Sequence, residues 1–73
     1  MEGFCMKLSA RNQLKGRITN ILKGATTSHI TIDVNGTVIT SAITNEAVAD
    51  LGLEVGKEAY AVIKASSVMV GVD

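Results

Sequence analysis

The sequence has no proline, one cysteine and only two aromatic residues, Phe4 and Tyr60. A single cysteine excludes an intrachain disulfide, and Cys5 with His29 is too small a ligand set for a structural zinc site. The sequence also has no apolar run long enough to span a membrane and no basic segment followed by a hydrophobic one. We therefore expect a cytoplasmic protein with a reduced cysteine and no membrane contact.

A net charge is also absent, because seven basic residues balance seven acidic ones. The chain therefore has no overall positive field to attract nucleic acid or an acidic membrane. The charges are unevenly distributed: residues 1–23 carry five basic residues against Glu2, a balance of +4, and residues 24–73 carry the opposite balance of −4. Exposed charge pairs contribute little, so attraction between the two parts is only a weak indication of how they pack.

The chain is short for its apolar content. A single domain of 73 residues buries only about 60% of the surface of its unfolded chain. Small domains compensate with disulfides, metals or oligomerisation, and only the last is available here. Because 47% of the residues are hydrophobic and the mean hydropathy is +0.31, we interpret the excess as a subunit interface.

Two segments near the middle of the chain predict antiparallel strands. Residues 13–22 alternate, with Leu14, Gly16, Ile18 and Asn20 on one side, and Gly16 indicates a bulge or a close backbone approach. Residues 28–34 alternate again and lead into Asn35-Gly36, a strong signal for a type I′ hairpin turn.

The turn fixes the register of the hairpin. It pairs Val34 with Thr37, Ile32 with Ile39 and Ser28 with Ile43, which gives one largely apolar face. His29 then pairs with Ala42 on the opposite face, where a lone histidine is more often a surface or interface residue than a ligand or a base.

A short helix is predicted at residues 44–51, with Thr44 or Asn45 as N-cap, Val48 and Leu51 facing inward, and Gly52 ending it. Strands at residues 58–64 and 68–72 follow. Five strands with one helix after the third predict an all-β fold, a small OB-like Greek-key barrel.

Polar residues are concentrated before the first strand, in Ser-Ala-Arg-Asn-Gln-Leu-Lys-Gly at positions 9–16. Five of the seven basic residues lie between Lys7 and Lys23, and no carboxylate interrupts them. Such a stretch suits a small anion, although a solvated strand face explains it equally well. The outward amides of Glu46 and Ala47 at the helix start are a second anion candidate, and simple capping by Thr44 is the alternative.

Other functions are less well supported. An OB barrel often binds single-stranded nucleic acid, but the neutral charge and missing aromatics remove the usual attraction and stacking. The alternative interpretation, a structural assembly module that binds no ligand, also remains open. Because no nucleotide-binding glycine motif, nucleophile or acid–base pair stands out, we do not expect an enzyme.

The stretch at residues 9–16 resembles the signature of the molbindins, small molybdate-binding proteins, and the related TOBE domains of molybdate transport ATPases and regulators. A free-standing module is most similar to the molbindins. The resemblance covers residues 6–72, and since chains of the family start near Met6, it implies an extension at residues 1–5 and one Mop/TOBE-type molybdate-binding domain at residues 6–73. Weaker similarities follow in the expected order, at residues 40–44, 51–53, 56–58 and 61–65.

This resemblance implies an OB-like barrel assembled into a homo-hexamer, a trimer of dimers, that stores molybdenum in the cell. Molybdate, and also tungstate, would bind as an oxyanion between subunits, with no direct metal coordination. Arg11 and Lys64 would balance its charge, and we expect them to come from different subunits. Ala47 replaces a hydroxyl residue of some relatives, so only its amide could serve. The implied oxyanion contacts are Ser9, Ala10, Arg11, Asn12, Thr44, Ala47, Lys64 and Ala65.

Overall fold

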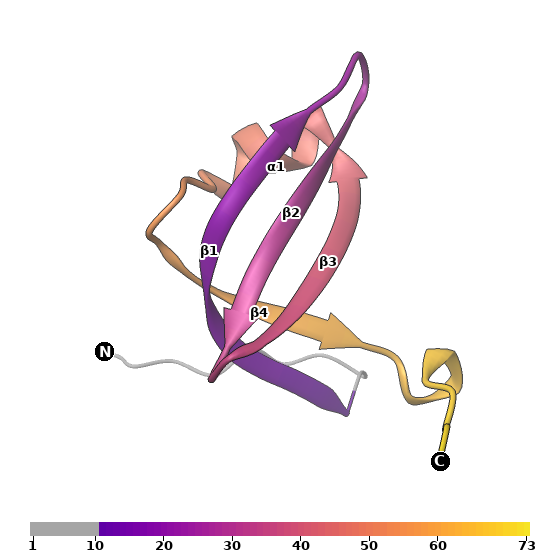
Figure 1. Ribbon diagram of the computed structural model, residues 1–73. Coiled ribbons are helices and arrows are strands. Elements are labelled where there is room, and N and C mark those ends of the chain that lie inside the picture. Colours follow the sequence, from indigo (N-terminus) through magenta and orange to yellow (C-terminus); the bar gives the residue numbers. More distant parts are fainter. Residues whose placement is uncertain (1–10) are drawn as a thin grey trace.

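The computed structural model describes residues 11–73, which form an antiparallel sheet of four strands curled into a half-barrel (Figure 1). The order in the sheet is β3-β2-β1-β4. The long strand β1 pairs with β4 along its first half and with β2 along its second half. The elements in chain order are β1 (Asn12–Lys23), β2 (Thr27–Val34), β3 (Thr37–Thr44), α1 (Asn45–Leu51), β4 (Glu58–Ile63) and the 3-10 turn η1 (Ala65–Ser67).

The predicted fold class is confirmed in part: the protein is mostly β, with its helix after the third strand. The prediction of a fifth strand at residues 68–72, and with it a closed five-stranded barrel, is wrong for this chain. After β4 the chain turns through η1, and the following segment leaves the sheet (Figure 1). Met69 and Val70 are 93% and 91% exposed. Without a neighbouring strand, the apolar alternation of this segment does not produce a strand.

The hairpin β2–β3 follows its prediction closely. Val34 pairs with Thr37, Ile32 with Ile39 and His29 with Ala42, so the register is confirmed. Asn35 and Gly36 both have positive φ, 51° and 92°, as the predicted turn requires. The Gly36 N–H also donates to Asp33 Oδ1 at 3.0 Å, which ties the turn to the end of β2.

The predicted alternation of β1 is correct only as far as Ile18. Ile18 pairs with Ile32 and Asn20 with Thr31, so Thr19 is the extra residue of a β-bulge. The bulge reverses the faces beyond it: Asn20, predicted to share a side with Ile18, is exposed, and Ile21 packs against the core.

Gly16 confirms the expectation of a close backbone approach. A Cβ at this position would lie 2.5 Å from the Asp33 carbonyl oxygen and 2.7 Å from Ile32 Cγ2. Gly16 pairs with Ala59 of β4, immediately before β1 begins its pairing with β2 at Arg17. The absence of a side chain therefore allows β1 to bend tightly over β2 where it passes from one partner to the other.

The core is small, with Ile18, Ile30, Ile32 and Ala61 as its buried hydrophobic residues within the described part of the chain. Helix α1 contributes Val48, which packs against this cluster. Leu51 lines the same apolar hollow as Ile18 and Ile30, as predicted, but it is 67% exposed and is not part of the buried core.

Candidate functional site

The first and last strands meet at one end of the sheet. Asn12 at the start of β1 pairs with Ile63 at the end of β4, and its Nδ2 donates to the Ile63 carbonyl at 3.2 Å. Because the two strands are antiparallel, Arg11 and Lys64 follow at the same end, immediately outside the ladder. Ala65 comes next and begins η1. The structure thus brings together four of the predicted contact residues, Arg11, Asn12, Lys64 and Ala65.

The two cations at this end are exposed, and neither side chain has a hydrogen bond or an ion pair with any residue of 11–73. Three other cations, Lys15, Arg17 and Lys57, do have partners. Lys15 Nζ lies 3.6 Å from Glu58 Oε1, and Arg17 Nη1 donates to the Gly56 carbonyl at 2.6 Å. Within residues 11–73, Arg11 and Lys64 therefore have no countercharge, and two cations without a countercharge at one end of a sheet favour an anion.

The expectation that Arg11 and Lys64 meet from different subunits rests on their separation in sequence. The β1–β4 ladder removes that reason, because it pairs their chain neighbours, Asn12 and Ile63, within one chain. The residue patterns of β1 and β4 do not show that β4 pairs with β1 rather than with β3. The sequence alone therefore does not predict that Arg11 and Lys64 lie at the same end of the sheet.

The remaining described candidates lie at the start of α1. Thr44 is the N-cap of the helix, and its Oγ1 accepts a hydrogen bond from the Ala47 N–H at 3.0 Å. This matches the capping alternative for the Ala47 amide, which already has an acceptor in this chain. The Thr44 hydroxyl is exposed, and since its oxygen accepts from Ala47, its own hydrogen remains a donor.

Asn45 holds the start of α1 against the loop that contains Gly24 and Ala25. The sequence predicts Asn45 only as a possible N-cap. Its Nδ2 donates to the Gly24 and Ala25 carbonyls at 3.0 and 3.2 Å, and its Oδ1 accepts from the hydroxyl of Ser28. Ser28 is only 1% exposed, so Asn45 satisfies the one polar side chain in the buried set. An asparagine beside a predicted N-cap could have indicated this clamp.

One chain does not bring the two groups of candidates together. Thr44 pairs with Thr27 at the helix end of the sheet, whereas Arg11 and Lys64 lie at the other end of β1. The twelve residues of β1 span roughly 35–40 Å at about 3.3 Å each. A site containing both groups therefore requires a second copy. Ser9 and Ala10, which were also predicted to contact the anion, lie outside the described residues, as does the predicted extension at residues 1–5.

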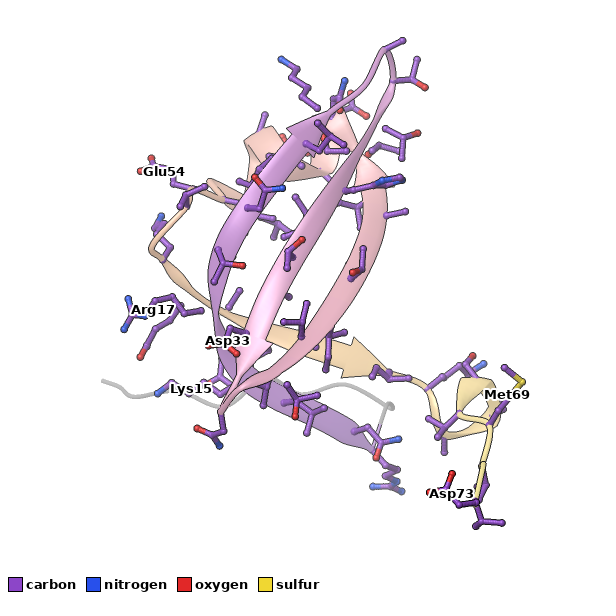
Figure 2. All side chains as sticks on the ribbon, viewed as in Figure 1. Lys15, Arg17, Asp33, Glu54, Met69 and Asp73 are labelled. Atoms are coloured by element: carbon purple, nitrogen blue, oxygen red, sulfur yellow. The ribbon has the colours of Figure 1, made fainter. Side chains whose placement is uncertain are left out.

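A second polar region lies on the outside of the sheet, where Lys15, Arg17 and Asp33 gather (Figure 2). With Glu58 these side chains line an open hollow of about 490 Å³. Two carboxylates balance the two cations there, so this hollow favours an anion less than the Arg11–Lys64 end does.

Further chemistry is limited in the part of the chain that the structure describes. Residues 11–73 contain no cluster of three or more His, Cys, Asp or Glu side chains arranged to hold a metal ion. His29 is exposed on the outer face of the hairpin, as its register predicted. Within the same residues, no helix has the length and apolar character needed to cross a membrane.

Comparison with known proteins gives consistent results. The family model of the TOBE domain matches residues 8–70. The "probable molybdenum-pterin-binding protein" of Haemophilus influenzae is 55% identical over 69 residues, which cover 93% of this chain and 100% of the relative.

Two solved structures share the fold. The molybdate-binding protein from Sporomusa ovata is 39% identical, with a TM-score of 0.88 over 92% of this chain and 100% of its own. The cytoplasmic molybdate-binding protein ModG, solved with molybdate bound, is 51% identical, with a TM-score of 0.88 over 93% of this chain. The present chain covers 49% of ModG.

Proposed function

Because this chain belongs to the molbindin family of TOBE-domain proteins, we propose that it binds molybdate at a site assembled from two copies of itself. The predicted family is confirmed, and with it the prediction that the chain is a binding protein rather than an enzyme. The bound molybdate in ModG, which is 51% identical, supports the choice of ligand.

The observation that carries the proposal is the pair of exposed cations beside the β1–β4 ladder, which have no partner among residues 11–73. Molybdate is a dianion with four acceptor oxygens, so Arg11 and Lys64 together neutralise its charge. Hydrogen bonds from charged donors are about twice as strong as neutral ones. The guanidinium of Arg11 presents a planar fork of donors, and the ammonium of Lys64 supplies a compact charge.

Thr44 of a neighbouring copy completes the site in this proposal. Its hydroxyl hydrogen is free, and the start of α1 adds a partial positive charge. The residues next to the two cations in sequence, Ser9, Ala10, Asn12 and Ala65, supply the remaining polar contacts in this proposal. Ala47 acts indirectly, since its amide holds the Thr44 oxygen in place.

The same donors suit tungstate, an oxyanion of the same shape and charge. Binding without a bond-making step fits the intracellular storage and homeostasis of molybdenum. We place the protein in the cytoplasm as a homo-hexamer, a trimer of dimers, with residues 1–5 as an extension before one domain at residues 6–73.

Calorimetry on Arg11→Ala and Lys64→Ala tests the site, with Lys15→Ala as the matched control. Lys15 belongs to the same basic stretch but already pairs with Glu58 at 3.6 Å. Removing either proposed contact leaves a desolvated dianion underpaired, which costs about 2–5 kcal/mol. We therefore expect molybdate affinity to fall at least about tenfold in the first two variants, and to change little in the control.

Light scattering must first show that each variant keeps the oligomeric state of the parent. Unchanged molybdate affinity in both Arg11→Ala and Lys64→Ala would then contradict the proposed site. Equal affinity for sulfate, which is smaller and leaves a preformed ring of donors incompletely closed, would contradict the proposed specificity.

A further inference from the structure

Asn45, the residue after the helix N-cap, is bound to the connection between β1 and β2. Its backbone N–H donates to the Thr26 carbonyl at 2.9 Å. Its Nδ2 donates to the Gly24 and Ala25 carbonyls at 3.0 and 3.2 Å. Its Oδ1 accepts from the hydroxyl of Ser28, the second residue of β2. The backbone N–H, the side-chain nitrogen and the side-chain oxygen of Asn45 therefore all have partners in one short stretch of the same chain.

Ser28 connects this contact to the sheet. Its side chain is buried, and its backbone pairs with Lys23 of β1 on one side and with Ile43 of β3 on the other. A buried hydroxyl that loses its partner is costly, because water does not reach it to replace the lost hydrogen bond. The bond from Ser28 therefore fixes the position of Asn45 relative to the three strands of the sheet that meet at this end.

Thr44 precedes Asn45 directly, so the same contacts determine where its side chain lies. Its backbone pairs with Thr27 at the end of the β2–β3 ladder, and its Oγ1 accepts from the Ala47 N–H at 3.0 Å. The side chain is exposed, and the hydroxyl hydrogen is left as a donor. Any displacement of Asn45 would displace this donor as well.

We propose that Ser28 and Asn45 are positioning residues that determine the anion specificity of the site, because they hold the Thr44 hydroxyl at a fixed place. The inference rests on the proposed function, in which this hydroxyl completes the ring of donors around molybdate. Neither positioning residue contacts the anion. Ser28 is buried, and the side-chain nitrogen of Asn45 already donates to carbonyls of its own chain.

A fixed donor favours molybdate because the competing oxyanions differ mainly in size. Sulfate has the same charge and shape as molybdate but is smaller, so a donor must move inward to contact it. A donor held by a hydrogen-bond network resists that movement, whereas a mobile donor follows the smaller anion at little cost. Weakening the Ser28–Asn45 bond should therefore reduce the difference between the two affinities more than it reduces the affinity for molybdate.

Hydrogen exchange without any oxyanion tests the positioning. The Ala47 amide reports on the Thr44 side chain, because Thr44 Oγ1 is its acceptor. We expect this amide to exchange at least about fivefold faster in Ser28→Ala and in Asn45→Ala than in the parent, the equivalent of one hydrogen bond. Ile32→Val is the matched control. It removes a methyl group from another buried residue of β2 and should leave the Ala47 amide nearly unchanged.

Calorimetry with molybdate and with sulfate as competitor tests the specificity in the same variants, once light scattering shows that each keeps the oligomeric state of the parent. The ratio of the sulfate to the molybdate dissociation constant should fall at least about fivefold in Ser28→Ala and in Asn45→Ala. It should keep the parent value in Ile32→Val. A merely structural role of the two residues would lower the stability of all three variants and leave the ratio unchanged.

An unchanged ratio in Ser28→Ala, or an Ala47 amide that exchanges in this variant as it does in the control, would overturn the inference. Ser28→Ala alone decides the matter if Asn45→Ala does not assemble. Failure of the proposed function is seen elsewhere, as a parent protein that does not bind molybdate, and that result would contradict both proposals. A parent that prefers molybdate, beside a Ser28→Ala variant with the same preference, contradicts only the positioning role.

Discussion

Gly16 shows how one missing side chain sets the geometry of the sheet. The backbone of β2 and the side chains of Ile32 and Val34 fill the space that a Cβ would need. Strain from an added methyl group cannot be relieved by rotating a flexible side chain, because the nearest atom is the main-chain oxygen of Asp33. The close approach therefore depends on glycine at this position.

We expect Gly16→Ala to reduce the free energy of unfolding by about 1–3 kcal/mol, the usual cost of overpacking. Thermal denaturation measures this, since about 1 kcal/mol corresponds to roughly 4–8 °C in a domain of this size. Lys15→Ala, at the adjacent and exposed position of β1, serves as the control and should cost much less. A melting temperature equal to that of the parent would show that β1 and β2 separate easily at this point.

Single residues also show the limit of sequence reasoning. Gly16 was predictable because a glycine inside an alternating strand usually marks a bulge or a close backbone approach. The bulge at Thr19 was not, because a bulge shifts the register without leaving a distinctive residue in this sequence. Asn45 and Ser28 are seventeen positions apart, and nothing local indicates their contact.

Among the elements, the hairpin β2–β3 is the most strongly determined by local sequence. The Asn35-Gly36 turn supplies positive φ at both central positions, and the alternation of the two strands admits one register that buries Ile30 and Ile32 together. Turn and pattern therefore predict the same pairing.

We expect Gly36→Val to destabilise the protein by about 1–3 kcal/mol, because a β-branched residue is strained at φ 92°. Gly36→Asn is the control, since asparagine tolerates positive φ better than other residues with a side chain. Chemical denaturation followed by circular dichroism measures both variants. Molybdate contacts should be unaffected, because the turn lies away from Arg11 and Lys64. A Val variant as stable as the Asn variant would contradict the role of this turn.

The C-terminal segment had the same alternating pattern as the hairpin strands and was still predicted wrongly as a strand of this chain. Alternation identifies a segment with one apolar face, but it does not identify which surface covers that face. In β2 the partner follows two residues later, whereas residues 68–72 have no partner in the described chain.

At the scale of the whole molecule, the buried core is small. Four hydrophobic residues of the described chain are buried, while Leu51, Val55, Met69 and Val70 are all more than 60% exposed. A lone chain of this kind has little to offset its conformational entropy. In the proposed assembly, association with further copies would cover this exposed apolar surface.

We therefore expect a stable hexamer, with a melting temperature that rises with protein concentration because association stabilises only the folded chain. Light scattering at micromolar concentration measures the mass. A monomer under these conditions would rule out the assembly and the two-copy site with it.

The candidate site also has a part that can be predicted from the sequence and a part that cannot. The sequence predicts an anion-binding stretch at residues 9–16, because a run of cations without carboxylates is a local signal. The neighbourhood of Arg11 and Lys64 depends on a ladder between β1 and β4. In the proposed site, the position of Thr44 relative to them depends on a second chain. Neither of these spatial arrangements can be predicted from the local amino-acid composition.

The β1–β4 ladder has a kinetic consequence. The hydrogen bond between Asn12 and Ile63 joins residues 51 positions apart, whereas the hairpin β2–β3 turns within two residues. Closing a long loop costs more entropy than closing a short one, so the hairpin should form early and β4 should dock late.

Pulse-labelled hydrogen exchange tests this order: amides of Ile32 and Ile39 should gain protection before those of Leu14 and Val62, and simultaneous protection would contradict it. Arg11 and Lys64 are held together only by the late ladder. A newly synthesised chain therefore acquires its paired cations in the final step of folding, and it cannot capture an oxyanion while it is still incomplete.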